Sequence, residues 1–279
     1  MNNNNLFLYS FLITISLGTF QFGYSIGVFN TLQVPFAGIF GWYEFQVGQE
    51  PDFTSANNWS TIITSVCTVG SAFGAIGSGS LVKYGKLKCI YMTNILVCIA
   101  SGIVLIENVI AICIGRFLYG LATGSFSVFV PLFINETAPF EIKGPVGVMT
   151  QFFVTFGIMI SFLLGVPIPS CPITSNYSGA VTQADFDSYT NWLNNTLVQQ
   201  YWRFMFGLPI LVAVLQIILL VFFFNYETPK TLKLQGKDEK LTKLMNRIYT
   251  DEQIAEVRIV AIPVEEKSSN DKDQQPTYG

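Results

Sequence analysis

Polar side chains interrupt the first apolar stretch of the chain, LGTFQFGYSIGVFN, which runs from residue 17 to residue 30. Gln21, Tyr24, Ser25 and Asn30 carry amide or hydroxyl groups that donate and accept hydrogen bonds. A helix that only anchors a protein has no use for such groups, because an unsatisfied polar group is costly in hydrocarbon. We therefore expect this helix to line a polar cavity. The alternative is that these groups bond across a helix bundle.

The residue inventory excludes several kinds of chemistry. No histidine occurs among the 279 residues, so histidine-based catalysis and histidine-containing metal sites are excluded. The five cysteines show no CxxC spacing, and four of them fall in apolar stretches where a buried thiol is ordinary. No basic cluster with interleaved aromatic residues indicates nucleic acid. We expect no enzyme activity, no metal or cofactor, and no nucleic-acid partner.

Composition places the chain in a lipid bilayer. Hydrophobic residues make up 51% of it and charged residues 12%, with a mean hydropathy of +0.46, whereas soluble domains carry about 25% charged residues. The first apolar stretch is too long and lacks the basic start of a signal peptide, so we expect a retained helix. Residues 1–229 are predicted to form an all-α bundle of six transmembrane helices, at approximately 6–29, 60–82, 89–106, 109–133, 146–166 and 203–225.

Lysine and arginine are distributed unevenly along the chain. Apart from Arg116 and Arg203, all of them lie between the second and third spans, between the fourth and fifth, or after the sixth. These segments share one side of the membrane, which the positive-inside rule assigns to the cytoplasm or the mitochondrial matrix. We expect an integral multipass protein with both termini on this side. This orientation is compatible with the mitochondrial inner membrane and with the plasma or internal membranes.

After the sixth span the chain changes character. Apolar residues between Leu241 and Ile248 recur at i, i+3, i+4 and i+7, the spacing of one helix face. Thr250 followed by Gln253 has the pattern of a capping box. The sequence predicts short amphipathic helices over 230–262, on the basic side of the membrane. Residues 263–279 have the composition of a disordered polar tail.

Arg116 opens the fourth predicted span and Glu136 follows its end, in the string GRFLYGLATGSFSVFVPLFINETAPFEIKG. Charge at membrane depth is expensive and is usually paired or functional. The string resembles the fourth helix and following loop of the sugar porters of the major facilitator superfamily, which read GR, VPxYxxExAP and RG. The matching positions are Gly115, Arg116, Val130, Pro131, Glu136, Ala138, Pro139, Lys143 and Gly144.

Three further segments resemble the same family and occur in the expected order. They are QFGY in the first helix, YWRFMFGLP at the start of the sixth, and YETPK, which is similar to the PESPR that ends the N-terminal half of a porter. The resemblance covers nearly the whole chain and implies half of a major facilitator fold. It also implies that the first, fourth and fifth helices face a sugar cavity. The candidate sugar-binding residues are then Gln21, Tyr24, Ser25, Asn30 and Gln151.

The chain departs from the family pattern at functional positions. Proton-coupled porters carry Asp directly after FGY, where this chain has Ser25, and a hydroxyl has no usable pKa for proton coupling. The loop that reads GxLxD/NRxGRR in the family reads GSLVKYGKLK here, with lysine for arginine, so the planar fork that grips a carboxylate is lost. The resemblance implies a weakened charge network on the basic side, formed by Lys83, Lys86, Arg116, Glu136, Lys143 and Glu227.

The resemblance covers one six-helix half, whereas the family has two. Alternating access needs two bundles moving around a central site, and a polar cavity face in lipid needs a cover. One hypothesis is a structural or accessory subunit whose cavity face is covered by other membrane protein subunits. The alternative is a passive carrier of a hexose-like sugar, formed by a homodimer or with a separate C-terminal half. A third hypothesis is that the chain is a fragment of a longer transporter. We rank the accessory subunit first, because the motif charges are weakened.

Overall fold

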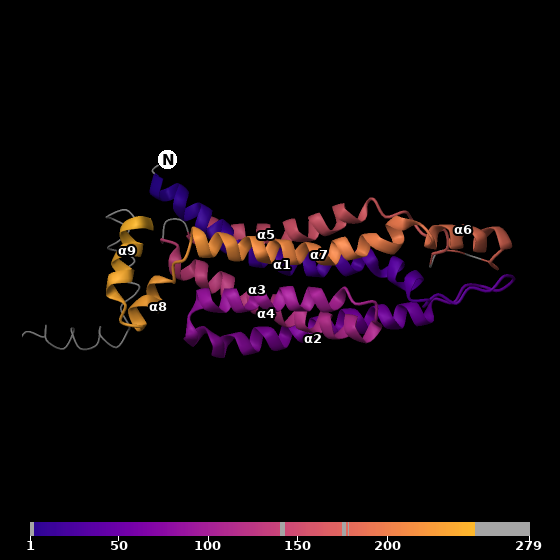
Figure 1. Cartoon of the computed structure of the whole chain (residues 1–279), viewed down its shortest axis with the longest axis horizontal. Coiled ribbons are helices and arrows are strands. Elements are labelled where there is room, and N and C mark those ends of the chain that lie inside the picture. The colour runs from indigo at the N-terminus through magenta and orange to yellow at the C-terminus, as the bar shows by residue number, and fades with distance from the viewer. Residues whose placement is uncertain (1–2, 140–142, 175–176, 178, 249–279) are drawn as a thin grey trace, which may run out of the picture.

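The computed structural model describes residues 3–139, 143–174, 177 and 179–248. Six long helices dominate this part of the chain, and all six are long and apolar enough to cross a membrane (Figure 1). They are α1 (Asn3–Ile39), α2 (Thr54–Leu81), α3 (Lys86–Val104), α4 (Val109–Thr137), α5 (Lys143–Gly165) and α7 (Thr196–Phe222). The shorter helices are η1 (Val82–Tyr84), α6 (Gln183–Leu193), α8 (Pro229–Leu234) and α9 (Asp238–Ile248). The described residues form no strand, and the predicted all-α membrane fold is confirmed.

Each long helix contains most of one predicted span, but several extend well beyond it. α1 continues from residue 29 through Pro35 to Ile39, and α4 continues from residue 133 to Thr137. α7 begins at Thr196 instead of residue 203 and ends at Phe222. Hydropathy marks the part of a helix that lies in hydrocarbon, whereas backbone hydrogen bonding continues into the polar ends.

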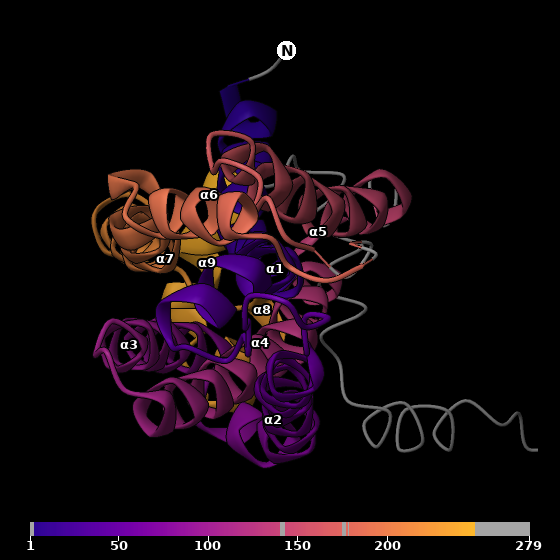
Figure 2. The same cartoon turned by 90° about the vertical axis from the view of Figure 1, so that its right-hand side faces the viewer.

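The helices differ strongly in burial. α1 lies in the middle of the bundle, packed against α4, α5 and α7, while α2 packs mainly on α4 (Figure 2). The most apolar window of α1 is 78% buried, against 22% for α2 and 17% for α5. α2 and α5 flank α1 and α4 on one side in the end-on view and leave wide surfaces exposed.

Glycines allow two helix pairs to bring their backbones into contact. A Cβ atom at Gly124 of α4 would lie 2.0 Å from the carbonyl oxygen of Ser71 in α2. A Cβ atom at Gly23 of α1 would lie 1.9 Å from the carbonyl oxygen of Val154 in α5. Any larger residue would force these helices apart. The contact at Gly23 also fixes how α1 is rotated about its own axis.

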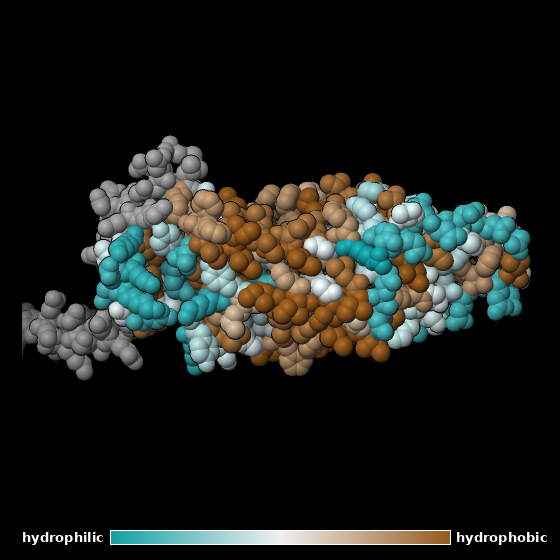
Figure 3. All heavy atoms as spheres, in the orientation of Figure 1, coloured by the Kyte–Doolittle hydropathy of each residue, from teal (hydrophilic) through white to brown (hydrophobic). Residues whose placement is uncertain are grey.

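The surface has an apolar belt between two polar ends (Figure 3). One end carries α6, and the other carries α8 and α9; we name them the α6 end and the α9 end (Figure 1). α9 buries Leu244 and Met245, in agreement with the amphipathic pattern. The capping box predicted at Thr250 and the tail predicted at 263–279 lie outside the described residues.

Candidate functional site

A pocket of about 260 Å³ with both polar and apolar lining residues opens between α1, α2 and α4, in the half of the bundle nearer the α6 end. α1 contributes Ser25 and Asn30, and α4 contributes Arg116. α2 contributes hydroxyl groups, among them those of Thr64 and Thr68. We name this cavity the Arg116 pocket. No carboxylate is among its lining residues, so one positive charge dominates it.

Arg116 is deeply buried and incompletely satisfied. The residue is 2% exposed, and its guanidinium carbon lies 4.9 Å from the ring centre of Phe29 and 5.5 Å from that of Phe206. Cation–π attraction from these rings offsets part of the cost of burying the charge. The Nε and Nη1 atoms nevertheless have no hydrogen-bond partner among the described residues. A buried cation with two free donors is suited to an anion or to a polar, hydroxyl-rich ligand.

Ser25 and Asn30 both line the Arg116 pocket. The Ser25 hydroxyl lies 3.7 Å from the sulfur of Cys67 in α2. The side-chain oxygen of Asn30 accepts a hydrogen bond of 3.4 Å from the amide of Gln33. Asn30 is exposed and lines the Arg116 pocket.

Gln21 and Tyr24 face the interior of the bundle and not the pocket. The Gln21 amide donates to the side-chain oxygen of Asn94 in α3, at 3.2 Å. The Tyr24 hydroxyl donates to the carbonyl oxygen of Met205 in α7, at 2.8 Å. Both residues are 1% exposed. The structure therefore gives these two groups the cross-bundle bonds that the sequence left as the alternative.

Gln151 lies on the exposed surface of α5, and it is not among the residues that line the Arg116 pocket. Thr155, one turn further along, is exposed as well. Only two of the five candidate sugar-binding residues, Ser25 and Asn30, therefore meet in one pocket.

A row of polar residues along α2 is a feature that the sequence analysis missed. These residues are exposed or half-buried and follow one another at intervals of four and three. The four hydroxyls donate to carbonyl oxygens three or four residues earlier, which leaves their lone pairs free to accept hydrogen bonds. The spacing of one helix face is the signal that could have revealed them. They are Asn57, Thr61, Thr64, Thr68 and Ser71.

A second polar cluster lies at the α9 end and joins α3, α4 and α8. The Lys86 ammonium lies 2.6 Å from a carboxylate oxygen of Glu136 and donates to the Thr231 hydroxyl at 3.1 Å. The Thr228 hydroxyl donates to Glu136 at 2.9 Å. Lys230 approaches the other Glu136 oxygen at 3.9 Å. These contacts hold the end of α4 and the start of α8 against the start of α3.

Glu227 completes this cluster by accepting hydrogen bonds from the backbone. The N–H groups of Lys86, Leu87 and Thr228 donate to its carboxylate at 3.1 to 3.2 Å. The negative charge lies at the N-terminus of α3, where the helix dipole favours it. Burial raises the pKa of the Glu227 carboxyl, and the backbone hydrogen bonds and Lys86 oppose this rise.

Two of the remaining members of the predicted charge network, Lys83 and Arg116, are not joined to this cluster. Lys83 is exposed and has no ion pair with a described residue. Lys143 is the first residue of α5, and its side chain lies outside the described part. Arg116 is twenty residues from Glu136 on the same helix, a separation of about 30 Å at 1.5 Å per residue. The structure places it in the Arg116 pocket.

Solved structures with the same arrangement of helices are secondary transporters. The major facilitator superfamily proton:xylose symporter XylE, bound to 6-bromo-6-deoxy-D-glucose, matches with a TM-score of 0.68 at 20% identity, over 92% of this chain and 53% of that one. The partially occluded, inward-open XylE of E. coli matches with a TM-score of 0.67, over 96% and 60%. This likeness shows the fold, and with the six apolar helices it makes the chain a multipass membrane protein.

The family described as "Sugar (and other) transporter" matches residues 11–277, and the chain belongs to this family. Hexose transporter 1 of Plasmodium knowlesi is 32% identical over 249 residues, which are 88% of this chain and 46% of that relative. Hexose transporter 1 of Toxoplasma gondii is 30% identical over 237 residues, 84% of this chain and 39% of that relative. The chain spans less than half the length of these relatives. The resemblance drawn from the motifs is confirmed.

Proposed function

We propose that this bundle is one half of a passive carrier for a hexose-like sugar. The observation that carries the proposal is the Arg116 pocket, which gathers hydroxyl and amide groups from α1 and α2 around one buried cation. Relatives of the chain are named hexose transporters. Ser25 supplies no proton-accepting group, and the pocket lining contains no carboxylate, so the proposed transport is not proton-coupled by this route.

The proposal requires a second bundle over α2 and α5. These helices expose the polar row of α2 and the amide of Gln151, and uncovered polar groups in hydrocarbon are costly. The halves of this superfamily are parallel repeats about an axis normal to the membrane. A second copy of the chain, a separate half, or a further part of a longer chain would each supply the cover. In this proposal both termini of the bundle face the cytoplasm or the mitochondrial matrix, as the lysine distribution predicts.

Sugar exchange in proteoliposomes tests the carrier proposal. The complete native assembly is purified in mild detergent, reconstituted, and assayed for uptake of labelled glucose against internal unlabelled glucose. Truncation of a pocket group in Asn30→Ala should reduce exchange about five- to tenfold, because a hydrogen bond to the ligand is worth about 1–1.5 kcal/mol. The control is Met92→Ala, which truncates an exposed side chain of α3. Equal rates in the two variants would refute the proposal.

The accessory-subunit hypothesis is the second candidate. Gln21 and Tyr24 favour it, because their bonds to Asn94 and Met205 remove two of the five expected groups from a sugar cavity. The mass and composition of the native particle distinguish the candidates. A particle of one or two bundle pairs agrees with a carrier. A particle of many different chains, with no glucose exchange after reconstitution, agrees with a subunit.

A further inference from the structure

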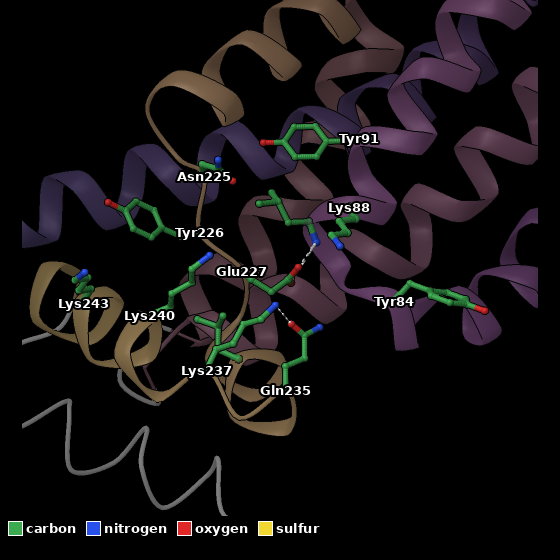
Figure 4. A pocket seen from close by; sticks show the side chains of 12 residues that line it. Tyr84, Lys88, Tyr91, Asn225, Tyr226, Glu227, Gln235, Lys237, Lys240 and Lys243 are labelled. Carbon is green, nitrogen blue, oxygen red and sulfur yellow. Dashed lines mark hydrogen bonds between the residues drawn. The ribbon is translucent and has the colours of Figure 1, made fainter.

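A second pocket, of about 430 Å³, opens at the α9 end, far from the Arg116 pocket (Figure 4). Its lining comes from η1 and the first turns of α3, from the connection between α7 and α8, and from α8 and α9. These segments are more than 130 residues apart in the sequence, so only the folded bundle forms this cavity. Leu87 and Leu232 contribute apolar surface, and Tyr91, Asn225 and Tyr226 contribute polar groups.

Positive charge dominates the lining of this pocket. Four lysines contribute to it, Lys88 from α3 and Lys237, Lys240 and Lys243 from the region of α9. The single carboxylate of the lining belongs to Glu227, which is already engaged by the backbone N–H groups at the start of α3. An anion entering the pocket therefore meets four ammonium groups and one compensated carboxylate.

Two of the four lysines have uncommitted ammonium groups. Lys237 donates to the side chain of Gln235 at 2.8 Å, and Lys243 pairs with Glu239 at 2.7 Å. Lys88 and Lys240 make no hydrogen bond or ion pair with a described residue. Figure 4 shows Lys240 extending from α9 toward the connection between α7 and α8. Each free ammonium offers three hydrogen-bond donors.

The hydroxyl of Tyr91 is an independent sign of a missing ligand. This oxygen is buried and has no hydrogen-bond partner among the described residues, although Tyr91 lines the pocket. Figure 4 shows the ring directed from α3 toward Asn225. A buried hydroxyl without a partner costs free energy. An acceptor oxygen in the pocket would satisfy it.

We propose that the pocket at the α9 end binds a phosphate group. A phosphate monoester presents several strong acceptor oxygens and close to two negative charges, which matches two free ammonium groups and a phenolic hydroxyl. A neutral sugar would leave the lysine charges uncompensated. The phosphate has two possible sources, a lipid headgroup or a soluble phosphate. Phe222 and Phe223, which shortly precede the lining residue Asn225 in the chain, are exposed, and this favours contact with lipid. The proposal holds for a carrier and for a subunit alike.

The test compares two double variants of the full chain, in nanodiscs of phosphatidylcholine. Lys88→Glu with Lys240→Glu reverses two pocket charges. Lys83→Glu with Lys233→Glu makes the same net change at the same end, at residues outside the pocket lining. One arm adds inorganic phosphate, and the other adds a phosphatidylinositol phosphate to the nanodisc. The thermal unfolding midpoint is followed against ligand concentration in each arm.

Binding should be at least about tenfold weaker in the pocket variant than in the wild type, because charge-assisted hydrogen bonds are lost, and nearly unchanged in the control variant. A response to inorganic phosphate identifies a soluble ligand. A response confined to the lipid arm identifies a headgroup. No response in either arm overturns the proposal, and so does equal weakening in both variants, which would indicate general surface charge. If the reversal variant misfolds, the neutral pair Lys88→Gln with Lys240→Gln must show the same loss.

Discussion

Lys86 and Arg116 are two buried cations in opposite halves of the bundle, and their surroundings differ completely. The exposed fractions are similar, 4% for Lys86 and 2% for Arg116. Lys86 forms an ion pair with Glu136 and a hydrogen bond with Thr231. Arg116 lies against phenyl rings, with two nitrogen atoms unpartnered among the described residues. The two side chains are buried to a similar degree, so the two sites differ in the partners of the charged group.

The comparison separates a structural charge from one that is available for binding. A buried ion pair offsets the desolvation of both members, and its hydrogen bonds hold the joined segments in one geometry. The Lys86 cluster therefore fixes α8 against α3 and α4. An unpaired buried cation keeps its desolvation cost until a ligand or a neighbouring bundle supplies the missing acceptor. This is why we propose that the Arg116 pocket is the binding site.

Breaking the paired site should have the largest effect. Glu136→Ala removes the carboxylate that forms the direct ion pair with the buried Lys86 ammonium, and we expect a loss of about 3–5 kcal/mol in the free energy of unfolding. Denaturant unfolding in detergent measures it. Glu239→Gln is the matched control, because it removes a carboxylate from the exposed pair with Lys243 and should have no measurable effect. Similar stability in the two variants would show that the cluster is not structural.

Removing the unpaired charge of Arg116 should reduce glucose exchange but leave the stability nearly unchanged. Arg116→Met removes a charge that has no counter-ion and keeps an apolar stem against Phe29 and Phe206, so the free energy of unfolding should change by less than about 1 kcal/mol. Glucose exchange should fall about tenfold or more, as expected if a hydrogen-bonded charge in the site is lost. A loss of stability like that of Glu136→Ala would mean that Arg116 is structural as well.

Introducing a carboxylate beside Arg116 should turn the unpaired site into a paired one like that of Lys86 and Glu136. Ser25→Asp adds a carboxylate to the lining of the Arg116 pocket, and we expect a higher free energy of unfolding than in Ser25→Asn, because the buried guanidinium gains a counter-charge. Ser25→Asn is the uncharged control. A gain in both variants would contradict an electrostatic origin.

The smallest expected effect concerns Glu227 beside the paired site. Burial raises the pKa of its carboxyl, so the folded state binds this proton more tightly than the unfolded state. The associated stability is present below the unfolded pKa and is lost as the pH rises through the folded pKa. Glu227→Gln should flatten this part of the stability curve, measured by thermal unfolding between mildly acidic and neutral pH. An unchanged slope would contradict the shift.

Much of the Lys86 cluster could be predicted from the sequence, whereas little of the Arg116 pocket could. Lys86, Glu136 and Glu227 belong to motifs that resemble the family, so their cooperation follows from the resemblance. The hydroxyl row of α2 carries only a spacing signal, which a hydropathy window averages away. α6 lies in a polar segment, where its capping box at Thr182 and Asp185 is a short local signal among polar neighbours.

The sequence by itself determined that the chain enters a membrane as six helices, because the lack of charge over about 20 residues is a property of composition. Only the tertiary structure decided which polar groups of α1 reach the pocket. The backbone contact of Gly23 with α5 sets the rotation of α1. That rotation turns Tyr24 toward α7 and leaves Asn30 at the pocket. Residues at successive positions of a helix point about 100° apart, so this packing contact, and not residue type, selects which of them can bind.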